Sequence, residues 1–271
     1  MVSIYAYLAK GGEKHSSGHE SALTNSRLNP RARLVVQTAQ QIRLPHLGVP
    51  IWRFCLYLLP CLFTLIAHAD NYDAQFNEWF AAQTNKQTWS ANFIQTRSLM
   101  ALAEPLKSTG KVWVEPGKFR WDLGHPPQTI VIRNPDELLI LYPRFKRAEI
   151  YALDRIPPGP IKDAMALLDV SIPRSRAALE EHFQLLSATI TNSILQMTLQ
   201  PKNPSARQFI SSTVMGFHTN DYVIADSQMN FSDGSTLRND FTDVVFNQPM
   251  DPKLFATNLP PDYTVVEPLN P

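Results

Sequence analysis

The chain has 271 residues, 44% of them hydrophobic, which is enough for one or two domains with a hydrophobic core. Its formal net charge is +1, but residues 1–69 hold seven Lys/Arg and two Asp/Glu, whereas residues 70–271 hold eighteen and twenty-two. The negative balance of the second part opposes nucleic-acid binding, because that affinity depends on attraction to phosphates.

The segment IWRFCLYLLPCLFTLIAHAD is typical of a secretory signal peptide. Arg53 precedes an apolar run over 54–66 that is short for a membrane span, and Ala67-His68-Ala69 forms a small-x-small cleavage site. We expect a signal peptide over 52–69, cleavage near Ala69 and periplasmic localisation; an anchor helix that stays attached is the alternative. Residues 1–51 are expected to be a leader from a misassigned start site or a disordered extension.

Both cysteines, Cys55 and Cys61, fall inside this apolar run. The mature chain is therefore expected to use no disulfide and no thiol chemistry. Leu58-Leu59-Pro60 lacks the small residue expected before a lipid-modified cysteine, which argues against lipid attachment at Cys61. We expect residues 70–271 to form one exported domain.

The mature chain begins with an amphipathic helix over 73–87. Phe76, Trp79 and Phe80 recur at helical spacing and form one apolar stripe, which predicts packing on a sheet. The period then changes to two at Trp89, Ala91 and Phe93. Turn signals separate the strands predicted after this one, at about 108–115, 118–123, 128–133, 137–142 and 147–152.

A Pro/Gly hinge at 157–160 interrupts these strands. It is followed by two predicted helices, at 161–169 and 174–181, the first apolar over much of its circumference. Strands resume at about 183–190, 194–200, 207–216, 222–231 and 234–246, with a hairpin turn at Asp233-Gly234. Phe255 and Val265 are expected to tether the end of the chain.

About eleven antiparallel strands in one sheet tend to curl or close. The sequence therefore predicts a mainly β, α+β fold: a single curved, incomplete antiparallel barrel with an N-terminal helix and helices inserted mid-chain. One strand poses a question. In 137–142, Leu138, Ile140 and Tyr142 share one face and Leu139 and Leu141 the other, so both faces need covering.

Motifs for catalysis and metal binding are absent from the sequence. It has no G-x-S-x-G, no HExxH and no glycine-rich phosphate loop, and His125, His182 and His218 are scattered without a metal-ligand spacing. We expect no enzymatic activity, no cofactor and no metal. A hydrolase with a dispersed triad is the alternative, since such triads leave no local signature.

One basic cluster, Arg144, Lys146 and Arg147, lies on a predicted hairpin connection. It is interpreted as a solvated turn, or as a contact with anionic headgroups or an acidic partner.

The order of motifs resembles the periplasmic lipoprotein carrier family, LolA. SANFIQT on a strand, GKVWVEPGKFRW, QTIVI and LLILYP are followed by a helical insert, then by DGSTL, DVVFN and DPKLF, so the resemblance covers 72 to about 268. It implies a half-barrel with a helical lid over an apolar cavity, which takes acylated lipoproteins or related lipids from an inner-membrane ABC or other exporter to an outer-membrane acceptor. It also implies a monomer without covalent chemistry.

The resemblance implies cavity and lid residues on two parts of the chain. The strands would supply Phe93, Val114, Phe119, Trp121, Ile130, Ile132, Leu138, Ile140 and Tyr142, and the inserted helix Met165, Leu167 and Leu168. Alternation places Phe119 with Trp121, Ile130 with Ile132, and Leu138 with Ile140 on common faces, without saying which face is concave.

One family feature is missing. The arginine that directly precedes the proline of this stretch in such carriers, and that helps to hold the lid, is replaced by Glu115 before Pro116. Arg120 is the nearest basic residue and alternates away from Phe119 and Trp121. The alternatives are therefore an envelope sensor of similar fold, or a companion of another exporter that binds a lipid other than a lipoprotein.

Overall fold

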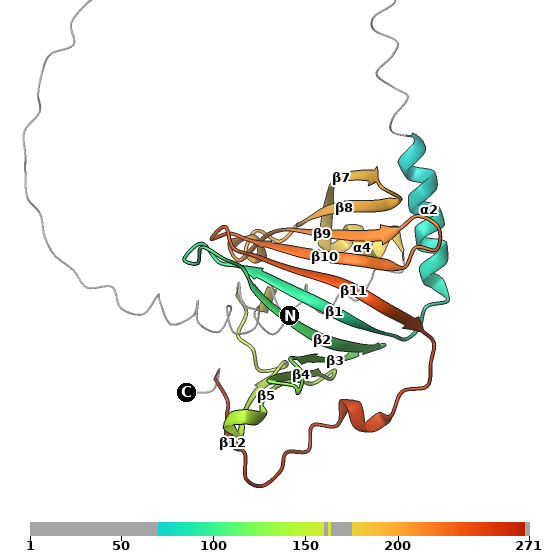
Figure 1. The fold of residues 1–271 in the computed structure, drawn as a ribbon. Helices are drawn as coiled ribbons and strands as arrows, with labels where there is room; N and C mark the ends of the chain where they lie inside the picture. Colours follow the sequence, from blue (N-terminus) through green and yellow to red (C-terminus); the bar gives the residue numbers. More distant parts are fainter. Residues whose placement is uncertain (1–69, 160–161, 164–174, 269–271) are drawn as a thin grey trace, which may run out of the picture.

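A computed structural model describes residues 70–159, 162–163 and 175–268 of the chain (Figure 1). Within these residues, two α-helices and three 3-10 helices accompany twelve strands. The α-helices are α2 (Asp70–Thr84) and α4 (Arg176–His182). The 3-10 helices are η4 (Pro143–Phe145), η5 (Ala206–Gln208) and η6 (Pro252–Phe255).

The strands form one curved, open sheet in the order β12-β6-β5-β4-β3-β2-β1-β11-β10-β9-β8-β7. They are β1 (Trp89–Ser98), β2 (Leu106–Glu115), β3 (Lys118–Leu123), β4 (Thr129–Arg133), β5 (Glu137–Tyr142), β6 (Arg147–Ala152), β7 (Phe183–Thr191), β8 (Ile194–Pro201), β9 (Ile210–His218), β10 (Ile224–Phe231), β11 (Thr236–Phe246) and β12 (Thr264–Val266). Every neighbouring pair is antiparallel except β12 with β6, which is parallel.

The predicted mainly β fold with a single curved sheet is confirmed. The eleven predicted strands correspond to β1–β11, and the twelfth is the short strand around Val265. The helix predicted at 174–181 is α4, where the Ser175 side chain caps the first turn by accepting a hydrogen bond from Ala178 N. Most of the helix predicted at 161–169 lies outside the described residues.

Helix α2 covers one half of the inner face of the sheet. Its predicted apolar stripe, Phe76, Trp79 and Phe80, is buried against side chains from α4 and β7–β10. Those side chains are Leu179, Phe183, Leu195, Met197, Leu199, Phe217 and Ile224. Trp79 is fully buried, with its ring 5.0 Å from that of Phe217 in an edge-on arrangement. The helix starts and ends about three residues earlier than predicted.

The C-terminal segment, residues 247–266, runs along the outer face of β3–β6 and ends as β12 (Figure 1). Arg120 Nη1 donates a hydrogen bond to Leu254 O at 3.2 Å, and Asn134 Nδ2 donates one to Phe255 O at 3.3 Å. Leu259 and Tyr263 pack on apolar side chains of β4–β6. This segment therefore covers the second apolar face of β5.

None of the helices in the described part of the chain is long and apolar enough to cross a membrane.

Candidate functional site

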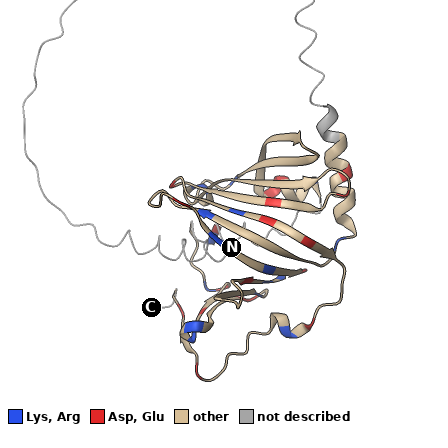
Figure 2. Cartoon of the chain, viewed as in Figure 1, with Lys and Arg blue, Asp and Glu red and all other residues tan. Residues whose placement is uncertain are grey.

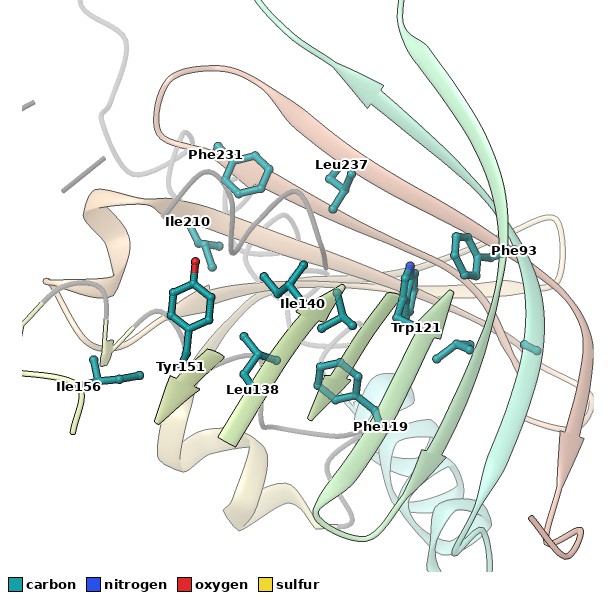
Figure 3. Packing of buried hydrophobic residues seen from close by; sticks show 13 residues of the cluster. Phe93, Phe119, Trp121, Leu138, Ile140, Tyr151, Ile156, Ile210, Phe231 and Leu237 are labelled. Atoms are coloured by element: carbon teal, nitrogen blue, oxygen red, sulfur yellow. The ribbon is translucent and has the colours of Figure 1, made fainter. Parts of the chain in front are cut away.

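A continuous apolar cluster occupies the inner face of the other half of the sheet (Figure 3). We call it the inner-face cluster. Its buried members are at most 7% exposed, and they are Ala91, Phe93, Val112, Phe119, Trp121, Val131, Leu138, Ile140, Tyr151, Ile156, Ile210, Phe231 and Leu237.

Seven of the sequence-predicted residues meet at this cluster. Alternation along each strand brings Phe93, Phe119, Trp121, Leu138 and Ile140 to the inner face, where they are buried. Val114 and Tyr142 are half-buried and pack against them. The prediction that Phe119 shares a face with Trp121, and Leu138 with Ile140, is therefore confirmed.

Ile130 and Ile132 share a face with each other, as predicted, but it is the outer face. Antiparallel partners point to the same side of a sheet, and Ile130 is paired with Leu141 and Ile132 with Leu139. Both isoleucines belong to the outer cluster that Leu259 and Tyr263 cover. Grouping them with the residues of a single cavity was wrong, and Val131 takes their place on the inner face.

The predicted lid residues Met165, Leu167 and Leu168 lie outside the described residues.

Trp121 is the one tryptophan among the buried members of the inner-face cluster, and it is 2% exposed. Its ring lies 4.2 Å from that of Phe93 and edge-on to Phe241 at 6.3 Å, measured between centroids. The indole Nε1 is buried and makes no hydrogen bond with any of the described residues. A buried donor without a partner costs roughly 1–3 kcal/mol, and such groups are uncommon enough to need an explanation.

Two small polar systems interrupt the apolar inner face. Gln95 Nε2 donates to Asn239 Oδ1 at 3.0 Å, and Asn239 Nδ2 donates to Ser227 Oγ at 3.3 Å, which makes a row across β1, β11 and β10. Tyr151 donates its hydroxyl to Glu149 Oε2 at 3.0 Å. Burial, and then the charge of Glu149, raise the pKa of the Tyr151 phenol far above its ordinary value, so it remains a donor at physiological pH.

Eight buried members of the cluster were missed by sequence reasoning. They are Ala91, Val112, Val131, Tyr151, Ile156, Ile210, Phe231 and Leu237. Ala91, Val112, Val131 and Tyr151 lie on strands that the sequence predicted, and alternation alone groups Ala91 with Phe93 and Val112 with Val114. The others come from connections or from strands on the far side of β1, and only the curvature of the sheet brings them to β3–β6.

An apolar pocket with a volume of about 330 Å³ lies beside helices α2 and α4. Its walls are apolar residues of α2, α4 and β7, with polar and charged residues around them. The lining consists of Phe76, Phe80, Arg176, Leu179, Glu180, Phe183, Gln184, Leu185 and Lys202.

The basic residues predicted as a turn or a headgroup contact all have intramolecular neighbours. Lys146 Nζ lies 2.8 Å from Asp262 Oδ2, Arg147 lies 2.9 Å from Glu149, and Arg144 lies over the ring of Phe145. Lys146 also accepts the backbone N–H of Thr264 on its carbonyl. In the structure this turn helps to hold β12 against β6.

Arg120 points to the outer face, as its alternation predicted. Its guanidinium binds both carboxylate oxygens of Asp122, at 2.7 and 3.0 Å, in addition to Leu254 O. It therefore fastens the C-terminal segment.

Within residues 70–159, 162–163 and 175–268, no three His, Cys, Asp or Glu side chains come together in a way that could hold a metal ion.

Several solved structures are similar to this chain at low identity. An uncharacterised conserved protein from Thermus thermophilus has a TM-score of 0.42 and 8% identity, over 72% of this chain and 99% of that one. A putative outer membrane lipoprotein-sorting protein domain from Vibrio parahaemolyticus has a TM-score of 0.40 and 11% identity, over 67% and 94%. The lipoprotein LppX from Mycobacterium tuberculosis has a TM-score of 0.36 and 7% identity, over 68% and 98%. These TM-scores are too low to support any inference about function.

No curated protein matches this chain. Residues 84–258, which are well over half of the chain, match the family model described as outer membrane lipoprotein carrier protein LolA. The match includes all of β1–β11, and with them the strands that build the inner-face cluster. The chain therefore belongs to the LolA family of outer membrane lipoprotein carrier proteins.

Proposed function

We propose that this protein carries the acyl chains of lipoproteins or related lipids on the inner face of its sheet, from the inner to the outer membrane. The observation that carries the proposal is the inner-face cluster, an apolar surface contributed by many strands of a curved sheet. Membership of a carrier family agrees with it.

The free energy of exposing an acyl chain explains why such a surface is needed. Each buried CH2 is worth about 0.8 kcal/mol, so one long chain in water would cost on the order of 10 kcal/mol. Transfer from a bilayer to an apolar surface is nearly neutral by the same reasoning. Extraction would therefore be driven by an inner-membrane ABC or other lipid exporter, and release would need an outer-membrane acceptor.

Binding requires the cluster to open. Side chains of β3–β6, such as Leu138 and Ile140, are buried together with Ile210 and Phe231 from the other half of the sheet. An acyl chain can reach these buried side chains only after they become exposed. The contacts between protein side chains are then replaced by contacts with the lipid, at little net cost in buried area.

The N–H of Trp121, which has no partner among the described residues, fits a polar linkage at the head of the chain. Its ring neighbours are Phe93 and Phe241, neither of which can accept a hydrogen bond. The carbonyl oxygen of an ester or amide on the bound lipid would satisfy it.

Further proposals come from the sequence. Residues 52–69 would be a signal peptide and 70–271 the lipid-binding domain, exported to the periplasm as a monomer. Met165, Leu167 and Leu168 would belong to a lid, and no catalytic residue or cofactor would be required.

Native mass spectrometry of the protein purified from envelope extracts tests the proposal and identifies the cargo. We expect bound lipoprotein or lipid, and uptake of a fluorescent fatty acid by the emptied protein. A protein that carries nothing and takes up no fatty acid would refute the carrier function.

A matched pair of variants separates binding from folding. Ile140 and Leu139 are adjacent on β5, equally buried, and point to opposite faces. Each change to alanine should cost roughly 2–5 kcal/mol of stability. Only Ile140→Ala should alter fatty acid uptake, and an equal effect of Leu139→Ala would mean that the inner face is ordinary core.

A further inference from the structure

The hairpin between β1 and β2 has an unusual composition. Its tip, residues 99–106, consists of the connection and the first residue of β2 and reads LMALAEPL, in which Glu104 is the one charged residue. We call it the hairpin tip. Loops of this kind are normally rich in polar and turn-forming residues, because water surrounds them.

The apolar side chains of the hairpin tip point into solvent. Met100 is 78% exposed, Leu102 45% and Leu106 50%, and these are three of the nine exposed large hydrophobic residues in the described part of the chain. Single exposed hydrophobic residues are ordinary, but several on one short loop form a patch that indicates an interaction site.

The hairpin tip stands at a projecting end of the molecule. Figure 1 shows the β1–β2 and β10–β11 connections extending together beyond one end of the sheet. They lie side by side, since a Cβ added to Gly234 in the second connection would be 3.2 Å from the Met100 sulfur. A flat surface could therefore reach the hairpin tip without meeting the rest of the sheet.

Basic residues stand at the base of the hairpin tip. In the β1–β2 register, Arg97 is paired with Leu106, and Lys107 with Thr96, so both cations lie where the strands end. Figure 2 shows Lys and Arg at this end of the sheet. The acidic residues in the two connections are Glu104 and Asp233. The hairpin tip and these two cations match the layers of a bilayer surface. The apolar tip corresponds to the acyl chains, and the cations correspond to the anionic headgroups that lie outside them.

We infer that the hairpin tip inserts into the interface of a membrane that contains anionic lipids. Met100, Leu102 and Leu106 enter the boundary between headgroups and acyl chains, and Arg97 and Lys107 contact the headgroups. The small apolar area makes the attachment weak and reversible, which suits a protein that must leave one membrane for another. The inference concerns docking and does not depend on the identity of the cargo.

Hydrogen exchange measured by mass spectrometry tests the inference at the level of single segments. The full chain is mixed with vesicles of phosphatidylethanolamine and phosphatidylglycerol. We expect slower exchange in the peptide that covers 99–106, and unchanged exchange in the peptide that covers β7, where Leu186 and Ile190 are also exposed. Vesicles of phosphatidylcholine alone should protect the hairpin tip less.

Variants give the second readout, by vesicle flotation. Met100→Asp with Leu102→Asp should reduce binding at least about tenfold, because two apolar side chains lose their burial. Leu186→Asp with Ile190→Asp is the matched control and should bind normally. The apolar run over 54–66 is the same in all variants, so a difference in binding between the two double variants comes from the substituted side chains.

The inference would be overturned by no binding to vesicles, by binding without protection of 99–106, or by equal loss in both double variants. Protection of the hairpin tip by an envelope protein fraction but not by vesicles would also overturn it, in favour of a protein partner. Thermal unfolding of each variant shows whether it has folded. The carrier proposal is tested separately, since fatty acid uptake in solution needs no vesicle.

Discussion

The ring of Phe93 occupies the space that a side chain at Gly110 would need. The two residues are direct partners in the β1–β2 register, and a Cβ on Gly110 would lie 2.2 Å from Phe93 Cζ and 2.2 Å from the carbonyl oxygen of Asp122. Phe93 can therefore lie flat on β2 and reach Trp121. The aromatic pair at the centre of the inner face depends on a glycine that leaves this space free.

Gly110→Ala should displace Phe93 and destabilise the fold by roughly 1–3 kcal/mol, the usual cost of overpacking a buried site. Unfolding in urea, followed by tryptophan fluorescence, measures it. Adding Phe93→Leu should restore only the part of the loss that comes from the ring, because the Asp122 carbonyl oxygen would still lie 2.2 Å from the new methyl group. A double variant no more stable than Gly110→Ala would contradict this account of the site.

Trp121→Phe should keep most of the ring packing while removing the unpaired N–H. The loss of volume and the removal of a buried donor without a partner act in opposite directions, so stability should change by less than about 2 kcal/mol. If the N–H binds a lipid carbonyl, affinity for a fatty acyl ester should fall about fivefold to tenfold, as expected for one hydrogen bond. Affinity for a hydrocarbon probe of equal length should stay the same. Equal losses for both probes would argue against the hydrogen bond.

Arg120→Met should release the C-terminal segment. The change leaves the Asp122 carboxylate, which is 8% exposed, without its cation, and it removes the donor to Leu254 O. Breaking a buried pair in this way costs roughly 3–5 kcal/mol. Limited proteolysis should then cut within 247–266 faster than in the parent protein. Arg120→Met with Asp122→Asn should recover stability, since no charge stays buried alone; failure to recover would mean that the contact with Leu254 dominates.

Asp226 should make stability depend on pH. Burial raises the pKa of its carboxyl above the ordinary value; Arg238 opposes this, Asp240 adds to it, and His218 opposes it weakly. Because the pKa is higher in the folded state, the stabilisation is complete below the ordinary carboxyl range and is lost as the pH rises through the raised pKa.

Asp226→Asn should therefore be more stable than the parent protein at pH 7, and the difference should vanish at a pH below the ordinary carboxyl range. Thermal unfolding across this range measures it. Asp243→Asn, at an exposed position of β11, is the control. An Asp226→Asn protein that is less stable at pH 7 would show that the contact with Arg238, 3.4 Å away, outweighs burial.

Strand positions and shared faces could be predicted from the sequence because they depend on a period of two within one strand. Phe119 with Trp121 and Leu138 with Ile140 needed only their own strand. Which of two apolar faces is the inner one could not be predicted, because that depends on the sense of curvature. Ile130 and Ile132 were misplaced for this reason, since β4 carries apolar residues on both faces.

Contacts between distant parts of the chain could not be predicted from the sequence either. Ile210, Phe231 and Leu237 reach the inner-face cluster because the sheet bends across β1 and β11, and no local pattern encodes that bend. The hairpin tip was also missed, since LMALAEPL resembles a buried segment until its exposure is known. Arg120, in contrast, was placed correctly by alternation alone.

Apolar residues on both faces of β5 have a consequence for folding. A strand with one buried face resists a shift of one residue, because the shift would turn its apolar side chains to water. In β5 such a shift would exchange one apolar face for the other, so burial gives little protection against misalignment. The turns at the two ends of β5 must fix its register instead. In the first, Asn134 N donates a hydrogen bond to Glu137 O at 2.9 Å, and in the second, Lys146 N donates one to Pro143 O at 3.2 Å. The correct register of β5 with its neighbouring strands thus depends on two short loops at the surface, where a substitution would look harmless.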